Sequence, residues 1–173
     1  MQSVLSFKNE PGKDRALLEN WRPISLVKVD TKIMSKVIAA RIKKVLPSII
    51  HYNQTGYVRD RFIGEAISSI FDIMDFTAKE NIPGLLLFID FRKAFDSVEW
   101  EFLFESLNIK SLTLVETSFN GWKPFITTFN GVSSNFFTLE RGVRLGDPLS
   151  SYLFIIAVET FKLAIAIRQK ETI

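Results

Sequence analysis

The sequence predicts a mixed α/β (α+β) fold in which a small sheet packs against helices. Short apolar runs alternate along the chain with longer segments whose apolar residues recur at helical spacing. Of the 173 residues, 47% are hydrophobic and 13% are aromatic, which suffices for one well-packed domain or two small interlocking lobes. No internal repeat or low-complexity tract interrupts the chain. We therefore expect one continuous body.

Composition narrows the chemistry that the chain can perform. It contains one histidine and no cysteine, which excludes zinc sites and Cys or His nucleophiles. Any catalysis must use carboxylates, hydroxyls, lysines and arginines. The N-terminus has no signal-peptide pattern, and the longest apolar run, 153–158, is far shorter than a membrane span. We expect an intracellular protein, nuclear or cytoplasmic, with no membrane partner.

The first part of the chain predicts a hairpin and then a helix. Strands at 4–7 and 22–27 flank a polar loop around Lys13. A helix is expected from Asp30, as its cap, to about residue 46, where Pro47 stops it. Its lysines form either a solvated face or a face that contacts phosphates. The expected inward positions are Ile33, Val37, Ile38, Ile42 and Val45.

A second helix is expected after the link at 54–61, which carries a glycine and two arginines. The helix ends near Asn81, because the following Ile-Pro-Gly breaks the helical pattern. Its apolar stripe is expected to face the core. The residues of this stripe are Ile63, Ile67, Ile70, Phe71 and Met74.

The apolar run 85–89 predicts a buried strand that ends on a carboxylate. About five residues without alternation suit a strand covered on both faces. Asp90 follows, where metal-binding acids commonly emerge from α/β sheets, although a merely solvated strand-end acid is the alternative. Asp96 and Glu99 have the spacing of a capping box, so Asp96 is either a helix cap or a second acid of the site.

The second half predicts a helix, a hairpin and a closing helix. A short helix is expected within 108–123, and strands at 125–129 and 135–139 flank the turn Asn130-Gly131. A helix with an apolar face precedes them. The residues of that face are Trp100, Leu103, Phe104 and Leu107.

The loop 141–150 joins this hairpin to the closing helix. Its two glycines let backbone approach a ligand, and its two arginines add positive charge. Asp147 is expected as N-cap and Pro148 as the first residue of the helix. The expected inward residues of this helix are Leu149, Leu153, Ile156, Phe161 and Ala164.

Four stretches carry a family resemblance. They are residues 21–26 (Trp-Arg-Pro-Ile-Ser-Leu), 54–57 (Gln-Thr-Gly-Tyr), 90–97 (Asp-Phe-Arg-Lys-Ala-Phe-Asp-Ser) and 141–150 (Arg-Gly-Val-Arg-Leu-Gly-Asp-Pro-Leu-Ser). In this order they resemble two fingers motifs, motif A and motif B of the reverse transcriptases of non-LTR (LINE-type) retrotransposons. The resemblance covers nearly the whole chain.

The resemblance implies a fold and an activity. The fold is a partial right-hand polymerase, with a fingers-like region at 1–83, a partial palm with motifs A and B at 84–173, and no thumb. The activity is RNA-directed DNA polymerisation, in which a primer 3′-hydroxyl attacks a deoxynucleoside triphosphate beside two Mg²⁺ ions. The implied partners are an RNA or DNA template-primer and deoxynucleoside triphosphates. The oligomeric state is left open.

The resemblance also implies roles for single residues. Asp90 would be the catalytic carboxylate and Mg²⁺ ligand, with the backbone carbonyl of Phe91 as a further ligand. Arg22 would bind the triphosphate, Phe95 would lie against the sugar 2′-carbon, and Gly146 would border the nascent base pair. The residues implied to contact nucleic acid or to form loop contacts are Lys13, Arg61, Arg141, Gly142 and Arg144.

Departures from the family qualify this activity. Leu145 replaces the usual glutamine, Ser151 a proline and Glu10 a lysine. The two adjacent aspartates of motif C do not occur in this chain. We therefore expect the chain alone to be inactive as a polymerase, because one acid cannot hold two Mg²⁺ ions. The alternatives are a retroelement remnant that binds nucleic acid weakly and an unrelated basic α/β binding module.

Overall fold

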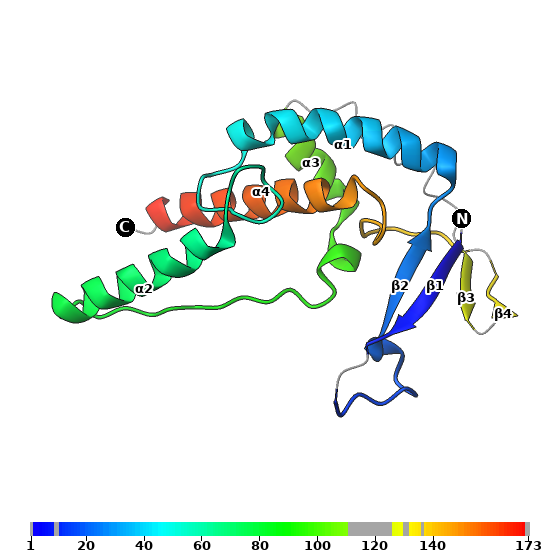
Figure 1. Cartoon of the computed structure of the whole chain (residues 1–173), viewed down its shortest axis with the longest axis horizontal. Helices are drawn as coiled ribbons and strands as arrows, with labels where there is room; N and C mark the ends of the chain where they lie inside the picture. Colours follow the sequence, from blue (N-terminus) through cyan, green and yellow to red (C-terminus); the bar gives the residue numbers. More distant parts are fainter. Residues whose placement is uncertain (1, 9–10, 111–125, 130–131, 136, 172–173) are drawn as a thin grey trace.

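The computed structural model describes residues 1–173 except 1, 9–10, 111–125, 130–131, 136 and 172–173. A small sheet lies beside a group of helices, so the predicted mixed α/β fold is confirmed (Figure 1). The elements in order are β1 (Gln2–Phe7), the 3-10 helix η1 (Leu18–Asn20), β2 (Trp21–Leu26), α1 (Val29–Ile49), α2 (Ile63–Lys79), the 3-10 helix η2 (Ala94–Ser97), α3 (Trp100–Ile109), β3 (Ile126–Phe129), β4 (Val132–Ser133) and α4 (Ser150–Glu171).

The sheet has the strand order β2-β1-β3-β4. β1 and β2 form the predicted antiparallel hairpin, in which Val4 lies opposite Ile24, and β1 also pairs with β3 in parallel. β3 and β4 pair antiparallel, so the second predicted hairpin is also confirmed. Its second strand is β4 rather than 135–139, because pairing resumes directly after the turn, at Phe129 opposite Val132. The turn residues 130–131 and the helix predicted within 108–123 lie largely outside the described residues.

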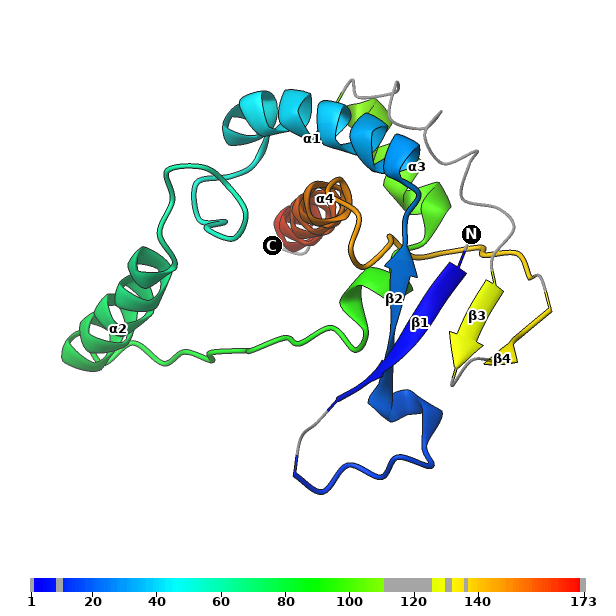
Figure 2. The same cartoon turned by 45° about the vertical axis from the view of Figure 1, so that its right-hand side comes forward.

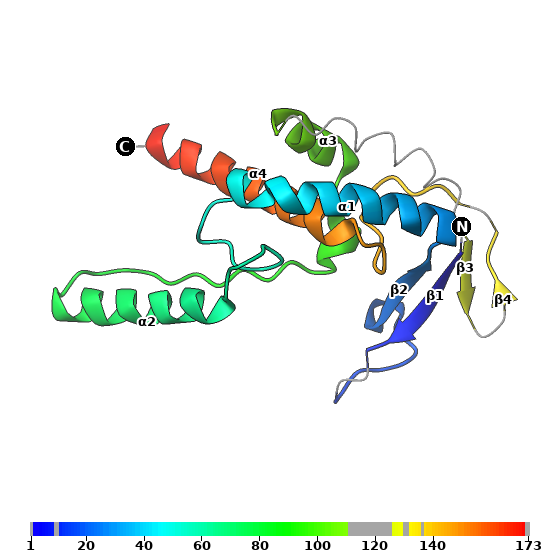
Figure 3. The same ribbon diagram turned by 45° about the horizontal axis from the view of Figure 1, so that its top comes forward.

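The core forms where α4 packs between α1 and α3 (Figures 2 and 3). The face predicted for α3 is confirmed, and Phe104 is partly buried at its border. The C-terminal half of α4 was expected to face inward, but it projects beyond α3, so Phe161 is 42% exposed and Ala164 is exposed (Figure 3). Residues that are fully buried in this core include Leu103, Leu107, Leu149, Leu153 and Ile156.

α1 differs from its predicted limits and face. It begins at Val29 with Lys28 at the N-cap position, and it continues past Pro47 to Ile49. Proline has no backbone N–H, so Pro47 removes one helical hydrogen bond. Because this loss falls near the C-terminal end of α1, the last turn remains helical. The predicted stripe is confirmed only at Ile42, which is buried, and at Ile38, which is partly buried. The buried face is otherwise shifted to neighbouring positions, where small residues at 35 and 39 face the core. The buried residues are Ser35, Ala39, Ile42 and Leu46.

Two apolar segments predicted to be buried are exposed in the structure. α2 has no buried residue, and Phe71 on its predicted core face is 61% exposed. Residues 85–89 form no strand but an extended segment that runs back beside α2, with Leu85 91% exposed (Figures 1 and 2). A strand needs a hydrogen-bonding neighbour, and no described strand lies beside this segment.

The helix α4 is long and apolar enough over Ser150–Arg168 to cross a membrane by length and composition. Its N-terminal half supplies Leu153 and Ile156 to the core, each 0% exposed, and it carries the buried Glu159. These positions are typical of a core helix.

A set of three hydrogen bonds holds the turn around η2 against the loop before α4. The Gly142 N–H donates to the Val98 carbonyl at 2.7 Å, and the Val143 N–H donates to the Phe95 carbonyl at 2.7 Å. The Trp100 indole N–H donates to the Gly142 carbonyl at 2.8 Å. We call this set the backbone clasp.

We predict that Gly142→Ala destabilises the protein. Gly142 has φ of +92°, and an added Cβ would lie 3.1 Å from the Asp96 carbonyl oxygen, within the clasp. The strain should lower the free energy of unfolding by about 2 kcal/mol in urea titrations followed by circular dichroism. Gly84→Ala is the matched control, because no atom lies within 4 Å of its added Cβ. Equal stability of the two variants would contradict the clasp.

We also predict that the chain self-associates. The exposed apolar side chains of α2 and of residues 85–89 form more apolar surface than a monomer usually exposes. Light scattering at increasing concentration should show dimers or larger species, and Phe88→Glu together with Phe71→Glu should reduce them. A monodisperse monomer at all concentrations would oppose this prediction.

Candidate functional site

A cleft of about 480 Å³ lies between β2 and the turn that contains η2. Arg22 and Pro23 of β2 line one side, and residues 90–96 line the other. Leu145, from the loop before α4, completes the lining. The predicted triphosphate ligand Arg22 and the predicted metal ligand Asp90 therefore border one cleft, although they are far apart in the sequence.

The loop before α4 lies directly against β2. The Ser25 N–H donates to the Leu145 carbonyl at 3.1 Å. Gly146 follows with φ of +100°, and an added Cβ would lie 3.4 Å from the Ser25 carbonyl oxygen. Glycine is required here because the loop adopts a left-handed conformation close to strand backbone. The contact places Leu145 in the cleft, whereas the predicted role of Gly146 beside a base pair stays a prediction.

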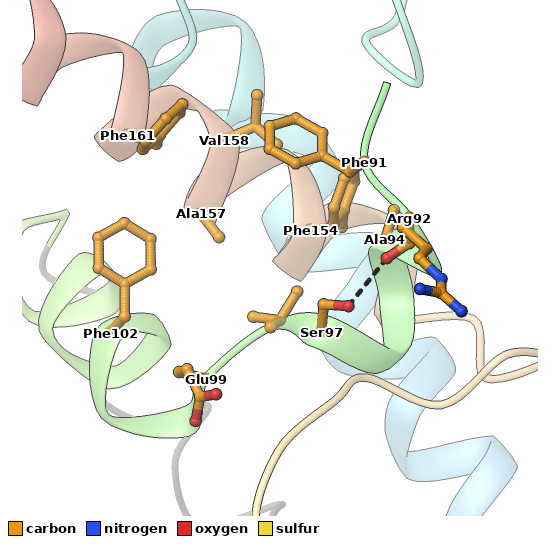
Figure 4. Close-up of a pocket in the computed structure, with 11 residues that line it drawn as sticks. Phe91, Arg92, Ala94, Ser97, Glu99, Phe102, Phe154, Ala157, Val158 and Phe161 are labelled. Atoms are coloured by element: carbon orange, nitrogen blue, oxygen red, sulfur yellow. Dashed lines mark hydrogen bonds between the residues drawn. The ribbon is translucent and has the colours of Figure 1, made fainter. Parts of the chain in front are cut away.

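Aromatic contacts fix the segment that carries Asp90. The ring of Phe91 packs edge-on against Phe154 and Phe161 of α4, with centroids 6.4 and 6.1 Å apart. Phe95 stacks on Phe154 at 5.1 Å, and it also lines the cleft. The rings of Phe91, Phe154 and Phe161 border a separate apolar pocket of about 240 Å³ between η2, α3 and α4 (Figure 4). Asp90 is thus held at the cleft by its anchored neighbour.

The carboxylates of the cleft differ in their surroundings. Asp90 is exposed to solvent, whereas burial raises the pKa of Asp96, and the nearby Lys93 partly opposes this rise. Among the described residues, no group of three or more His, Cys, Asp or Glu side chains could hold a metal ion. The described side chains therefore do not fit a complete two-Mg²⁺ site, which needs several oxygen ligands for each ion.

The cleft carries more positive than negative side chains. Lys8, Arg22, Arg92 and Lys93 line it, against the carboxylates of Asp90 and Asp96. Such a lining attracts compact anions, above all phosphates. The sequence interpretation had singled out Arg22 but not Lys8, Arg92 or Lys93. The position of Arg92 and Lys93 directly after Asp90 was the available signal.

The arginines of the loop before α4 have unequal surroundings. Arg141 is exposed, forms an ion pair with Glu99 at 3.4 Å, and lines a neighbouring cleft of about 600 Å³ with Gly142. Arg144 is only 3% exposed, and burial lowers its pKa to about 10 while Asp147 partly opposes this. The implied contact of Arg144 with nucleic acid is not supported by this burial.

Arg61 has a structural role in the described geometry. Its guanidinium donates to the carbonyls of Pro47 and Ile50 at the end of α1, and to those of His51 and Gln54. These bonds satisfy carbonyls that a helix end leaves open. They do not favour the implied contact of Arg61 with nucleic acid. Lys13 lies in the exposed loop between β1 and η1, outside the lining of this cleft.

The two predicted helix caps have different outcomes. Asp96 does not cap α3, because it lies within η2 and Glu99 occupies the N-cap position. Asp147 accepts the Leu149 N–H at 2.9 Å and the Ser35 hydroxyl at 3.0 Å. It therefore caps the turn that leads into α4, which begins at Ser150 rather than at Pro148.

Comparisons with known proteins show the family of this chain. A family model described as reverse transcriptase (RNA-dependent DNA polymerase) matches residues 8–170. The chain is 33% identical over 165 residues to the transposon TX1 149 kDa protein of Xenopus laevis. The aligned residues are 92% of this chain and 12% of that relative. It is 27% identical over 151 residues to a 115 kDa protein of the Drosophila melanogaster retrotransposable element R1DM. These residues are 86% of this chain and 14% of that relative.

A third relative is the Pol polyprotein of the retrotransposable element R2 of Nasonia vitripennis. The chain is 30% identical to it over 139 residues, which is 78% of this chain and 13% of the relative. The chain thus spans between about an eighth and a seventh of the length of these relatives. From the family match and these relatives, the chain belongs to the reverse transcriptases of LINE-type retrotransposons.

Proposed function

We propose that this chain forms the nucleotide-binding part of a reverse transcriptase domain, with residues 1–83 as fingers and 84–173 as part of the palm. The observation that carries the proposal is the cleft that Arg22 and Asp90 share. Arg22 binds the triphosphate of a deoxynucleotide, because a guanidinium can donate two parallel hydrogen bonds to phosphate. The partly buried ring of Phe95, which lines the cleft, lies against the sugar.

Catalysis needs more carboxylates than this cleft supplies. Asp90, with the Phe91 carbonyl, contributes ligands toward Mg²⁺, but one exposed carboxylate does not balance the charge of two such ions. Asp96 is a poor substitute, since burial raises its pKa. We infer that nucleotide addition by this domain requires acidic residues beyond those that the described part of the chain brings to this cleft, and that the chain alone binds substrate without polymerising it.

A second candidate function is nucleic-acid binding without catalysis. The exposed lysines of α1 favour it, because they lie outside the cleft and can contact successive phosphates of a backbone. Leu145 also favours it, because its side chain lines the cleft but offers no hydrogen bond to a substrate.

We predict that Arg22→Ala weakens the binding of a deoxynucleoside triphosphate by about tenfold, because a charge-assisted phosphate contact is lost. Titration calorimetry with the purified chain and dTTP measures the change. Arg59→Ala is the matched control, since Arg59 is exposed, pairs with Asp60 and lies outside the cleft. Equal losses in both variants would indicate charge attraction alone and would remove the support for a specific site.

We predict that the chain does not extend a primer on an RNA or DNA template in the presence of Mg²⁺ and deoxynucleotides. The same preparation should bind the template-primer in a filter assay, with an affinity that falls as salt rises. Extension that Asp90→Ala abolishes would overturn the inferred inactivity. Binding that does not respond to salt would exclude the second candidate function.

A further inference from the structure

An ion pair links the two sides of the cleft. An Arg92 guanidinium nitrogen lies 2.7 Å from a Glu19 carboxylate oxygen. Arg92 lines the cleft from the side of Asp90, and Glu19 belongs to η1, directly before the strand that carries Arg22. A residue that faces the anion-attracting cleft is therefore held by an acid from the opposite side.

Hydrogen bonds hold the backbone next to Glu19 in place. Asn20, next to Glu19, is 6% exposed, and its side-chain amide donates to the Asp14 carbonyl at 2.8 Å. Its own carbonyl accepts the Lys8 N–H at 2.9 Å. The backbone next to Glu19 is thus anchored to the end of β1 and to the hairpin loop, which keeps its carboxylate within reach of Arg92.

Arg92 combines a fixed backbone with an exposed side chain. Its carbonyl accepts the Ser97 hydroxyl at 3.0 Å (Figure 4). The following Lys93 has a left-handed backbone, with φ of +50° and ψ of +47°, and its carbonyl accepts the Asp96 N–H at 2.8 Å. The Arg92 side chain is 79% exposed, compared with 54% for Glu19. Its guanidinium can therefore change partners while the turn beneath it stays in place.

We propose that Glu19 and Arg92 form an anion-operated latch on the cleft. A polyphosphate that enters the cleft takes Arg92 from Glu19, and Arg92 then binds it together with Lys8, Arg22 and Lys93. The exchange is favourable because an exposed ion pair is weak, whereas a polyphosphate carries several charges and accepts paired hydrogen bonds from a guanidinium. This latch deepens the proposed nucleotide site and rests on it.

The shape and charge of the cleft favour a compact polyphosphate over a nucleic-acid backbone. Its basic residues surround one space of about 480 Å³, into which Arg22 and Arg92 reach from opposite sides. A phosphodiester backbone carries one charge per nucleotide, so it places fewer charges within one such space. A triphosphate concentrates its charge there.

A double-mutant cycle with inorganic tripolyphosphate tests the latch. Calorimetry on the purified chain at about 50 mM salt keeps surface charges effective. Glu19→Gln should bind the probe about threefold more tightly, because Arg92 is released from a weak ion pair. Arg92→Ala should bind it about fivefold more weakly. Adding Glu19→Gln to Arg92→Ala should change nothing, because the residue that Glu19 restrains is gone.

Matched controls separate the latch from charge effects and from the nucleotide site itself. Glu80→Gln removes the same charge at the end of α2, outside the cleft, and should leave affinity unchanged. If Glu19→Gln tightens binding equally with and without Arg92, long-range charge explains the effect and the latch is refuted.

The Arg92→Ala and Arg22→Ala variants together decide which proposal fails. Normal affinity of Arg92→Ala beside weakened affinity of Arg22→Ala refutes the latch alone. Normal affinity of Arg22→Ala refutes the nucleotide site on which the latch rests. A blunt-ended DNA duplex without terminal phosphates should not reproduce the pattern of the cycle, and if it does, the latch responds to nucleic-acid backbone instead.

Discussion

The backbone clasp is the constraint on which the rest of the site depends. The peptide N–H of Val143 donates to the Phe95 carbonyl within η2, and that of Gly142 donates to the Val98 carbonyl directly after it. The Trp100 indole N–H donates to the Gly142 carbonyl. These bonds join segments that are far apart in the sequence at the buried border of α3 and α4. Main-chain atoms form two of its three bonds, so the clasp depends on side-chain identity at Trp100, which donates the third bond, and at Gly142, whose φ is positive.

A second backbone contact carries this constraint to the sheet. The loop that the clasp holds also bonds to β2 through Leu145 and Ser25, with Gly146 packed beside them. The separation of Arg22 from Asp90 is therefore set by two main-chain joints rather than by an interaction between their side chains. A cleft built in this way keeps its shape whether or not a metal site is complete, which explains how a well-formed anion cleft coexists with a single exposed acid.

Local signals in the sequence predicted the elements whose partners are close or whose faces are strongly patterned. The hairpin of β1 and β2, the apolar face of α3 and the cap at Asp147 belong to this group. The strand expected at 85–89 and the buried face of α2 were wrong, because each needs a packing partner that no described element supplies. Arg61 and Arg144 show the same limit of sequence-based prediction. Their positive charge is visible in the sequence, but the tertiary structure decides that Arg61 donates to backbone carbonyls and that Arg144 is buried.

The cleft separates the chemistry of binding from the chemistry of catalysis. The proposed binding of a triphosphate needs cations from both sides, and Arg22, Arg92 and their basic neighbours line the cleft. Holding two Mg²⁺ ions needs several carboxylates at one point, and Asp90 is the exposed carboxylate of this lining. A cleft with more basic side chains than carboxylates holds phosphate tightly. An enzyme, however, must later release its phosphate-bearing product. In the proposed latch, Glu19 competes for Arg92 and so weakens the retention of phosphate. The Glu19–Arg92 pair would thus limit the attraction of the basic side chains for phosphate, in a cleft whose carboxylates are too few for two Mg²⁺ ions.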